Sequence, residues 1–154
     1  MASAAVARTS YAEYLEFESK SLVRHEYLDG QVYAMAGGTP EHAALAAAMV
    51  RELGVALRGK PCRVFSADLR IRVRSSNLST YPDVSVVCGK LETDSEDQNA
   101  ALNPVILVEV LSEGTEAYDR GQKAMHYRRI PSLREYVLVS HQEQRIEVHR
   151  RSPQ

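Results

Sequence analysis

The order of apolar and polar residues in the first third of the chain predicts a short helix followed by a β-hairpin. Ser10 precedes Glu13 by three residues, which is the spacing of a helix capping box, so about two helical turns are expected after it. Segments 25–28 and 31–34 then flank Asp29-Gly30. This dipeptide accepts positive φ at both central positions of a type I′ turn, and it therefore predicts a hairpin.

A long amphipathic helix is predicted at about Pro40–Arg58, where the leading proline fits the first helical position because its missing N–H needs no partner there. Leu45, Met49 and Leu53 recur at four-residue steps and mark the apolar stripe. His42 lies three residues before the first of them on the same stripe. We therefore expect its imidazole to face the sheet, at the rim of a site near the hairpin.

The remaining pattern alternates strands with one further helix. We predict a long strand at Cys62–Val73, buried strands at Asp83–Cys88 and Pro104–Leu111, a helix at about Glu116–Arg129, and a closing hairpin of Glu135–Val139 and Arg145–His149. Side chains alternate between the two faces of a strand, so the arginines at positions 70, 72 and 74 are expected on one face of the long strand.

Length and composition fit one globular domain. The chain has 154 residues, of which 44% are hydrophobic and 25% charged, which is too apolar for a disordered chain and too polar for a membrane protein. We expect a flexible tail at residues 1–9 and a single domain at 10–154. No stretch approaches the roughly 18 apolar residues of a spanning helix, and a signal peptide is not indicated, so a cytoplasmic protein without membrane contact is expected. Cys62 and Cys88 form no CxxC pair and are expected to be buried, reduced thiols.

Net charge restricts any nucleic-acid partner to a local patch. Nineteen basic residues against twenty acidic residues give a net charge of −1, so no overall field attracts a polyanion. Arg70, Arg72 and Arg74 could contact phosphates, although a solvated strand face is the alternative. The acidic segment Glu92–Asp97 is expected to be a solvated loop.

Two carboxylates interrupt otherwise apolar strands. Asp83 begins one predicted strand, and Glu109 lies near the end of the next. Burying a carboxylate among Val, Ile and Leu is costly unless a cation or a network of donors meets it. If the strands are adjacent, both carboxylates can converge on a hard cation such as Mg²⁺ or Mn²⁺, which prefers oxygen ligands and needs few protein groups.

The helix after Glu109 carries a third candidate element. Asp119, Lys123 and Tyr127 follow one another at four-residue steps, so they share one helical face. Lys123 could fold back over the strand end to orient a water molecule or neutralise a phosphate. The alternative is an exposed Asp119–Lys123 ion pair, which contributes little to stability.

Six short motifs follow one another along the chain. They are the segments 26–32, 38–42, 81–87 and 108–112, the helix positions Thr115, Asp119, Lys123 and Tyr127, and Glu135-Tyr136 with Val139. Together they resemble the Uma family of putative restriction endonucleases, over about residues 11–149. Each motif alone is weak, but six in the same order are specific.

This resemblance implies membership of the PD-(D/E)xK nuclease-like superfamily. It implies an α/β (α+β) fold with a restriction-endonuclease-like core, in which a mixed sheet is flanked by helices, and a Mg²⁺-dependent phosphodiesterase site. Carried over by position, Pro82-Asp83 is the PD element, Glu109 the second acid and Lys123 the lysine. Glu26 and His42 match further characteristic positions.

The chain departs from the superfamily pattern at Leu111, which stands two residues after Glu109, where a (D/E)xK motif has its lysine. The resemblance suggests that Lys123 on the following helix takes its place. The chain also ends at Gln154, where members of the family usually continue with further strands.

The leading hypothesis is a metal-dependent nuclease that hydrolyses phosphodiester bonds in nucleic acid, with DNA as the expected substrate. Asp83 and Glu109 would hold the ion, and Tyr127 would support them. Asp68 is a candidate for the site edge, with a surface aspartate in a turn as the alternative. The competing hypotheses are a nuclease-fold binding module that does not cleave and a scaffolding protein whose buried acids are satisfied by arginine and backbone donors. The sequence leaves the oligomeric state open, a homodimer included.

Overall fold

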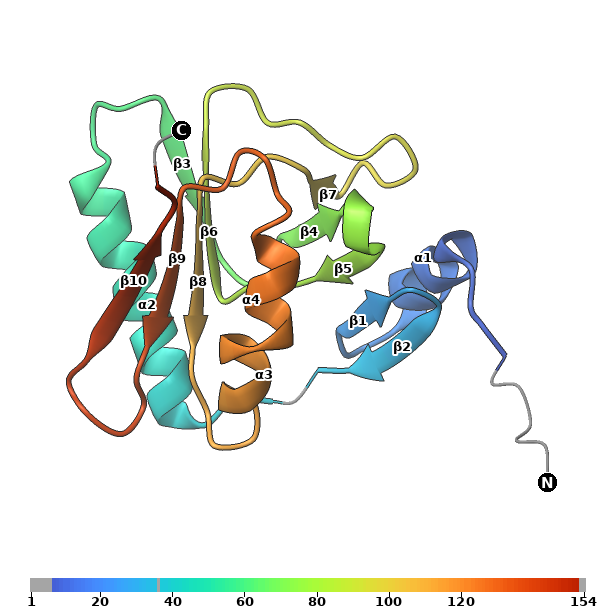
Figure 1. Cartoon of the computed structure of the whole chain (residues 1–154), viewed down its shortest axis with the longest axis horizontal. Coiled ribbons are helices and arrows are strands. Elements are labelled where there is room, and N and C mark those ends of the chain that lie inside the picture. The colour runs from blue at the N-terminus through green and yellow to red at the C-terminus, as the bar shows by residue number, and fades with distance from the viewer. Residues whose placement is uncertain (1–6, 36, 153–154) are drawn as a thin grey trace.

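The computed structural model describes residues 7–35 and 37–152, and within them the strands form two five-stranded mixed sheets with helices packed against them (Figure 1). The helices are α1 (Tyr11–Lys20), α2 (Pro40–Ala56), α3 (Glu116–Arg120) and α4 (Gln122–Tyr127), with a 3₁₀ turn at Arg74–Ser76. The strands are β1 (His25–Leu28), β2 (Gln31–Ala34), β3 (Cys62–Phe65), β4 (Arg70–Val73), β5 (Leu78–Thr80), β6 (Val84–Cys88), β7 (Ala100–Ala101), β8 (Ile106–Val110), β9 (Glu135–Val139) and β10 (Ile146–Arg150). The predicted flexible tail lies mostly outside the described residues. No helix in the described segments is long and apolar enough to cross a membrane.

The larger sheet has the strand order β10-β9-β8-β6-β3, and β8 and β9 are its parallel pair. Alternation along the strands sends two sets of side chains to opposite faces. Val84, Val108 and Val110 pack against the apolar stripe of α2, whereas Leu107 and Leu138 pack against α4. Figure 1 shows α2 on one face of this sheet and α3 and α4 on the other. The predicted mixed sheet flanked by helices is therefore confirmed.

The smaller sheet has the order β2-β1-β5-β4-β7 and is covered by α1. The predicted hairpin is confirmed, with Leu28 opposite Gln31 and Asp29 at positive φ in the turn. The capping prediction is also confirmed, because the Ser10 hydroxyl accepts a hydrogen bond from the Glu13 N–H at 3.1 Å. Since β1 pairs with β5, the hairpin is joined to the other strands of the smaller sheet.

The long strand predicted at 62–73 is wrong, because the chain turns between two separate strands. β3 pairs with β6 in the larger sheet, and β4 pairs with β5 in the smaller one. The Leu69 N–H bonds to the Ser66 carbonyl, and the Asp68 N–H bonds to the Ser66 hydroxyl. These short-range bonds are typical of a turn built on Ser and Asp.

The single helix predicted at 116–129 is also interrupted. It divides at Gly121 into α3 and α4, and a Cβ at this position would lie 3.0 Å from the Ala117 carbonyl oxygen. The interruption leaves the shared face intact, because Lys123 Nζ still lies 3.8 Å from Asp119 Oδ1.

The prediction of reduced thiols is wrong, because Cys62 and Cys88 form a disulfide. The two cysteines lie directly opposite each other in the antiparallel β3–β6 pair. Spacing along the chain did not reveal this, since the register that brings them together depends on the turn after β3.

Candidate active site

A cleft of about 300 Å³ lies where the hairpin, the start of α2, the adjoining ends of β6 and β8, and the helices α3 and α4 meet. Five of the residues predicted for the site line this cleft: Glu26, His42, Asp83, Glu109 and Lys123. Of the predicted residues other than the arginines, only Asp68 and Tyr127 do not line it. These five residues are separated by up to 97 positions along the chain, so the fold is what gathers them.

Asp83 and Glu109 lie on neighbouring strands, as predicted. Val84 pairs with Val108 in the antiparallel β6–β8 ladder, so Asp83, the residue before Val84, lies beside Glu109, the residue after Val108. The Asp83 carboxylate accepts a hydrogen bond of 2.7 Å from the Val110 N–H. His42 reaches it from α2, with 3.3 Å between Nε2 and Oδ2. The predicted inward orientation of His42 is thus confirmed, although its partner is Asp83.

Glu109 is buried on the face of the sheet that α4 covers. Its Oε1 accepts a hydrogen bond of 2.9 Å from the Tyr127 hydroxyl and lies 3.2 Å from Lys123 Nζ. Burial raises the pKa of the Glu109 carboxyl to about 8, and the nearby Asp83 and Asp119 charges add to this rise, while Lys123 and Tyr127 oppose it. A cation bound beside Glu109 would oppose this rise.

Lys123 is buried among carboxylates, with only 5% of its side chain exposed. Besides Glu109, its ammonium lies 4.0 Å from Glu26 Oε1 and 3.8 Å from Asp119 Oδ1. Burial alone would lower the pKa of Lys123, but the three acidic neighbours raise it above its usual value. The alternative of an exposed ion pair with Asp119 is wrong, and the predicted position of Lys123 next to Glu109 is confirmed.

Glu26 is fixed by two hydroxyl donors. Thr80 Oγ1 donates to Oε1 at 2.6 Å, and the Tyr118 hydroxyl donates to Oε2 at 2.9 Å. Tyr118 was not among the predicted site residues, and neither was Asp119, although the spacing placed Asp119 on the same helical face as Lys123. No sequence pattern distinguishes Tyr118 from the other tyrosines, because its contact joins residues 92 positions apart.

The cleft has an excess of negative charge. Four carboxylates, those of Glu26, Asp83, Glu109 and Asp119, line it together with a single lysine. Within residues 7–35 and 37–152, no group of three or more His, Cys, Asp or Glu side chains is arranged to hold a metal ion by itself. Mg²⁺ characteristically binds through one or two carboxylates and retains several waters, so the Asp83–Glu109 pair and the charge imbalance fit such an ion.

The sequence profile of Uma2, described as "Putative restriction endonuclease", matches residues 11–154. The chain belongs to the Uma2 family. It is 39% identical to the Synechocystis sp. protein slr1290 over 90% of this chain and 72% of that protein, and 32% identical to sll1609 of the same organism over 83% and 72%. A crystal structure described as a putative nuclease belonging to DUF820, from Anabaena variabilis, shares the fold with a TM-score of 0.75 at 19% identity, covering 92% of this chain and 79% of that one.

In this Uma2 chain, one of the two remaining predicted site residues, Tyr127, contacts the site, and the other, Asp68, does not. Tyr127 is fully buried and touches the site through its hydroxyl on Glu109. Asp68 lies in the turn between β3 and β4, has a 91% exposed side chain, and pairs with Arg24 instead of lining the cleft. The surface alternative therefore describes Asp68. Leu111, in the position of the missing lysine, is buried in the core between α4 and the two sheets.

The three arginines suggested as phosphate contacts have partners within the chain, because Arg70 and Arg74 pair with acidic residues and Arg72 is buried. Arg70 makes two hydrogen bonds with Asp97, at 2.7 and 2.8 Å, and Arg74 pairs with Asp94 at 2.6 Å. Arg72 is buried, with its guanidinium 3.7 Å from the centre of the Tyr11 ring. The acidic segment is accordingly only partly a solvated loop, since Asp94 and Asp97 are buried while Glu92 and Glu96 are exposed.

Proposed function

We propose that this chain is a divalent-metal-dependent nuclease that hydrolyses phosphodiester bonds in nucleic acid, with DNA as its substrate. The observation that carries the proposal is the convergence of Asp83, Glu109 and Lys123, from three separate elements, in one cleft. Membership of the Uma2 family supports it.

Asp83 and Glu109 would hold Mg²⁺ or Mn²⁺ through their carboxylate oxygens, which are the ligands that these ions prefer. When bound, such an ion polarises the scissile phosphate and stabilises the negative charge that develops on it. The residues around the two acids hold them in place: His42 and the Val110 N–H contact Asp83, and the Tyr127 hydroxyl contacts Glu109. Side chains held in this way lose little further freedom when they act as ligands.

Lys123 would stabilise negative charge on the phosphate or orient the attacking water. Its raised pKa keeps the ammonium charged throughout the neutral range, and its burial strengthens its electrostatic effect. Because Leu111 is part of the core, the strand itself has no lysine to offer at that position. Instead, Lys123 on α4 places its ammonium next to the Glu109 carboxylate.

Titration of the full chain with Mn²⁺ tests the metal site. We expect saturable binding, followed by calorimetry, that weakens at least tenfold in Asp83→Asn and in Glu109→Gln, because each variant removes a charged oxygen ligand. Asp68→Asn is the matched control, since it makes the same change at an exposed carboxylate outside the cleft, and it should bind as the parent does. Equal binding by Asp83→Asn and the parent would exclude this site.

A nuclease fold that binds nucleic acid without cleaving it is the second candidate. The observation that favours it is Leu111 in the lysine position of the motif. Such a module would bind nucleic acid, and could bind Mn²⁺, but would leave DNA and RNA uncut under all metal conditions.

A further inference from the structure

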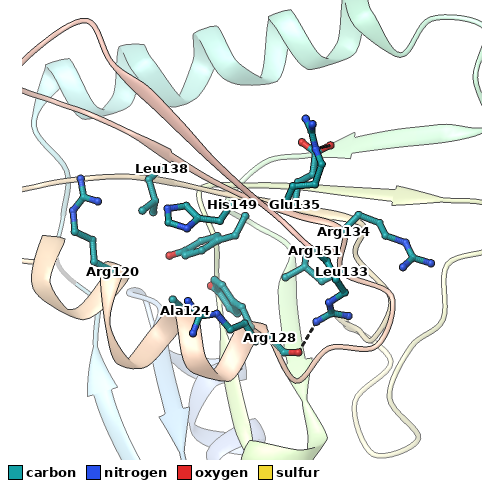
Figure 2. A pocket seen from close by; sticks show the side chains of 12 residues that line it. Arg120, Ala124, Arg128, Leu133, Arg134, Glu135, Leu138, His149 and Arg151 are labelled. Carbon is teal, nitrogen blue, oxygen red and sulfur yellow. Dashed lines mark hydrogen bonds and ion pairs between the residues drawn. The ribbon is translucent and has the colours of Figure 1, made fainter. Parts of the chain in front are cut away.

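A second pocket, of about 540 Å³, lies between α3 and α4 on one side and β9 and β10 on the other (Figure 2). The two helices direct Asp119 and Lys123 into the acidic cleft, and they direct Arg120, Ala124 and Arg128 into this pocket. The two sites share no lining residue. What binds in the second pocket is therefore a separate question from the chemistry of the first.

The lining of this pocket is strongly basic, although the whole chain has a net charge of −1. Five arginines and His149 line it, against one carboxylate, that of Glu135. Two of the arginines are neutralised by carboxylates: Arg120 by Glu147, at 2.7 and 3.0 Å, and Arg150 by Glu135, at 3.4 Å. The other three are Arg128, Arg134 and Arg151.

Among the residues that the structure describes, no carboxylate pairs with any of these three guanidinium groups. Arg151 donates hydrogen bonds to three backbone carbonyls, those of Ile130 at 3.1 Å, Pro131 at 3.2 Å and Arg128 at 2.5 Å. The dashed line in Figure 2 marks the bond between Arg151 and Arg128. Neutral carbonyls fix its position without cancelling its charge. Arg128 and Arg134 are exposed, and neither forms a salt bridge with a carboxylate of residues 7–35 or 37–152. A bound anion would supply the missing charge.

The floor of the pocket is apolar and partly aromatic. Leu133, Leu138 and the ring of Tyr136 are buried there, and the Tyr136 and Tyr127 rings meet edge to face with centroids 5.1 Å apart. The half-exposed His149 ring lies beside them, 6.4 Å from Tyr136. A planar, weakly polar group would fit against this surface while its charged end faced the arginines.

We propose that this pocket binds a nucleotide, with its phosphate held by Arg128 and Arg151 and its base placed against His149 and the apolar floor. Guanidinium groups match phosphate oxygens in charge and in fork geometry, and the volume lies within the range of ordinary ligand pockets. The nucleotide is either free or part of a nucleic-acid strand, since both present the same phosphate and base. The proposal does not rest on the nuclease assignment, because it involves neither metal nor cleavage.

Calorimetric titration of the full chain in metal-free buffer, with dAMP, a short single-stranded oligonucleotide and inorganic phosphate as separate probes, tests this site. We expect saturable binding of dAMP or of the oligonucleotide that weakens at least tenfold in Arg128→Gln. Arg128 is exposed, so the variant should retain the circular dichroism spectrum of the parent. Arg58→Gln, which alters an exposed arginine beyond α2, is the charge-matched control and should bind within twofold of the parent.

The two nucleotide probes distinguish the sources of the ligand. Tight binding of dAMP alone identifies a free nucleotide, and binding of the oligonucleotide alone identifies a strand. Either result supports the site when Arg128→Gln loses the binding. Three results would overturn the proposal: no saturable binding of either probe, equal weakening in Arg58→Gln, or inorganic phosphate binding as tightly as the nucleotides, which would leave no role for the base.

Discussion

Glu109 and Lys123 determine the electrostatics of the acidic cleft. The carboxyl is buried beneath α4, and its ionised form is stabilised by one ammonium and one tyrosine hydroxyl. Two more carboxylates, Glu26 and Asp119, compete for the same ammonium. In the metal-free protein, ionisation of Glu109 therefore costs free energy. This cost can be measured as a pH dependence of the free energy of unfolding.

Stability should consequently fall as the pH rises through the range in which Glu109 ionises. Its pKa is raised by burial from 4.5 to about 8, so the folded state binds more protons than the unfolded state between these values. The free energy of unfolding in metal-free buffer should decrease over this range by on the order of 4 kcal/mol, since each tenfold difference in proton affinity is worth about 1.4 kcal/mol. Urea denaturation from pH 5 to pH 8 measures it.

Glu109→Gln should remove most of this decrease, because glutamine keeps the shape of the side chain and has no proton to lose. The exposed Glu113→Gln serves as the control and should follow the parent. A pH profile that is the same in the parent and in Glu109→Gln would show that this carboxyl does not ionise at raised pKa in the folded protein.

Arg70 should contribute to stability and not to nucleic-acid binding. Its guanidinium joins β4 to Asp97 through two hydrogen bonds and donates a third to the Tyr81 hydroxyl, in a mostly buried environment. Arg70→Gln should lower the free energy of unfolding by roughly 3 kcal/mol, because it leaves a buried carboxylate without its partner. The exposed Arg58→Gln should lose less than about 0.5 kcal/mol. A loss below about 1 kcal/mol in Arg70→Gln, measured by urea denaturation, would contradict this role.

Residue patterns identified the acids of the cleft because charge in an apolar strand needs an explanation. Asp83 and Glu109 were recognisable for this reason, and Lys123 for its spacing on a helix. The arginine row misled because a strand with alternating Arg and Ile has the same pattern whether its arginines face solvent or meet acids from a distant loop. Asp94 and Asp97 supply those acids, and nothing local in the sequence indicates it.

Among the elements, those with strong local signals were predicted well. The hairpin around Asp29-Gly30 and the helix after Pro40 begin where their turn and cap residues place them. The predictions failed where one glycine or one short turn divides a periodic segment, as at Gly121 and at Ser66. Hydrophobic periodicity continues through both points, so the pattern alone cannot show that the chain changes direction.

A disulfide links β3 to β6, and its contribution to the free energy of unfolding can be measured. Cys62 and Cys88 are 26 positions apart, and closing a loop of this length restricts the unfolded chain. Reduction, or the double variant Cys62→Ala/Cys88→Ala, should lower the free energy of unfolding by about 3 kcal/mol. Thiol titration of the unreduced, denatured chain should detect no free thiol. Detection of two thiols, or unchanged stability after reduction, would contradict the disulfide.

At the scale of the whole molecule, the acidic cleft exists because the two sheets meet there. The smaller sheet brings Glu26, the larger sheet brings Asp83 and Glu109, and the helices on opposite faces of the larger sheet bring His42 and Lys123. The overall α/β class was predictable from the motifs and their order. The division of the strands into two sheets was not, because it depends on the turn after β3 and on the pairing of β1 with β5.

Cleavage of nucleic acid by the parent chain and by Lys123→Met tests the central claim most directly. We expect the parent to cut DNA in the presence of Mg²⁺ or Mn²⁺ and to stop when a chelator is added. Lys123→Met keeps the buried stem but removes the ammonium, and it should cut at least 100-fold more slowly while keeping its fold by circular dichroism and its Mn²⁺ binding. Lys90→Met, at an exposed lysine that follows the far end of β6 and does not line the cleft, should cut as the parent does. Cleavage by Lys123→Met at the parental rate would contradict the account, and a parent that leaves both DNA and RNA uncut would favour the binding module.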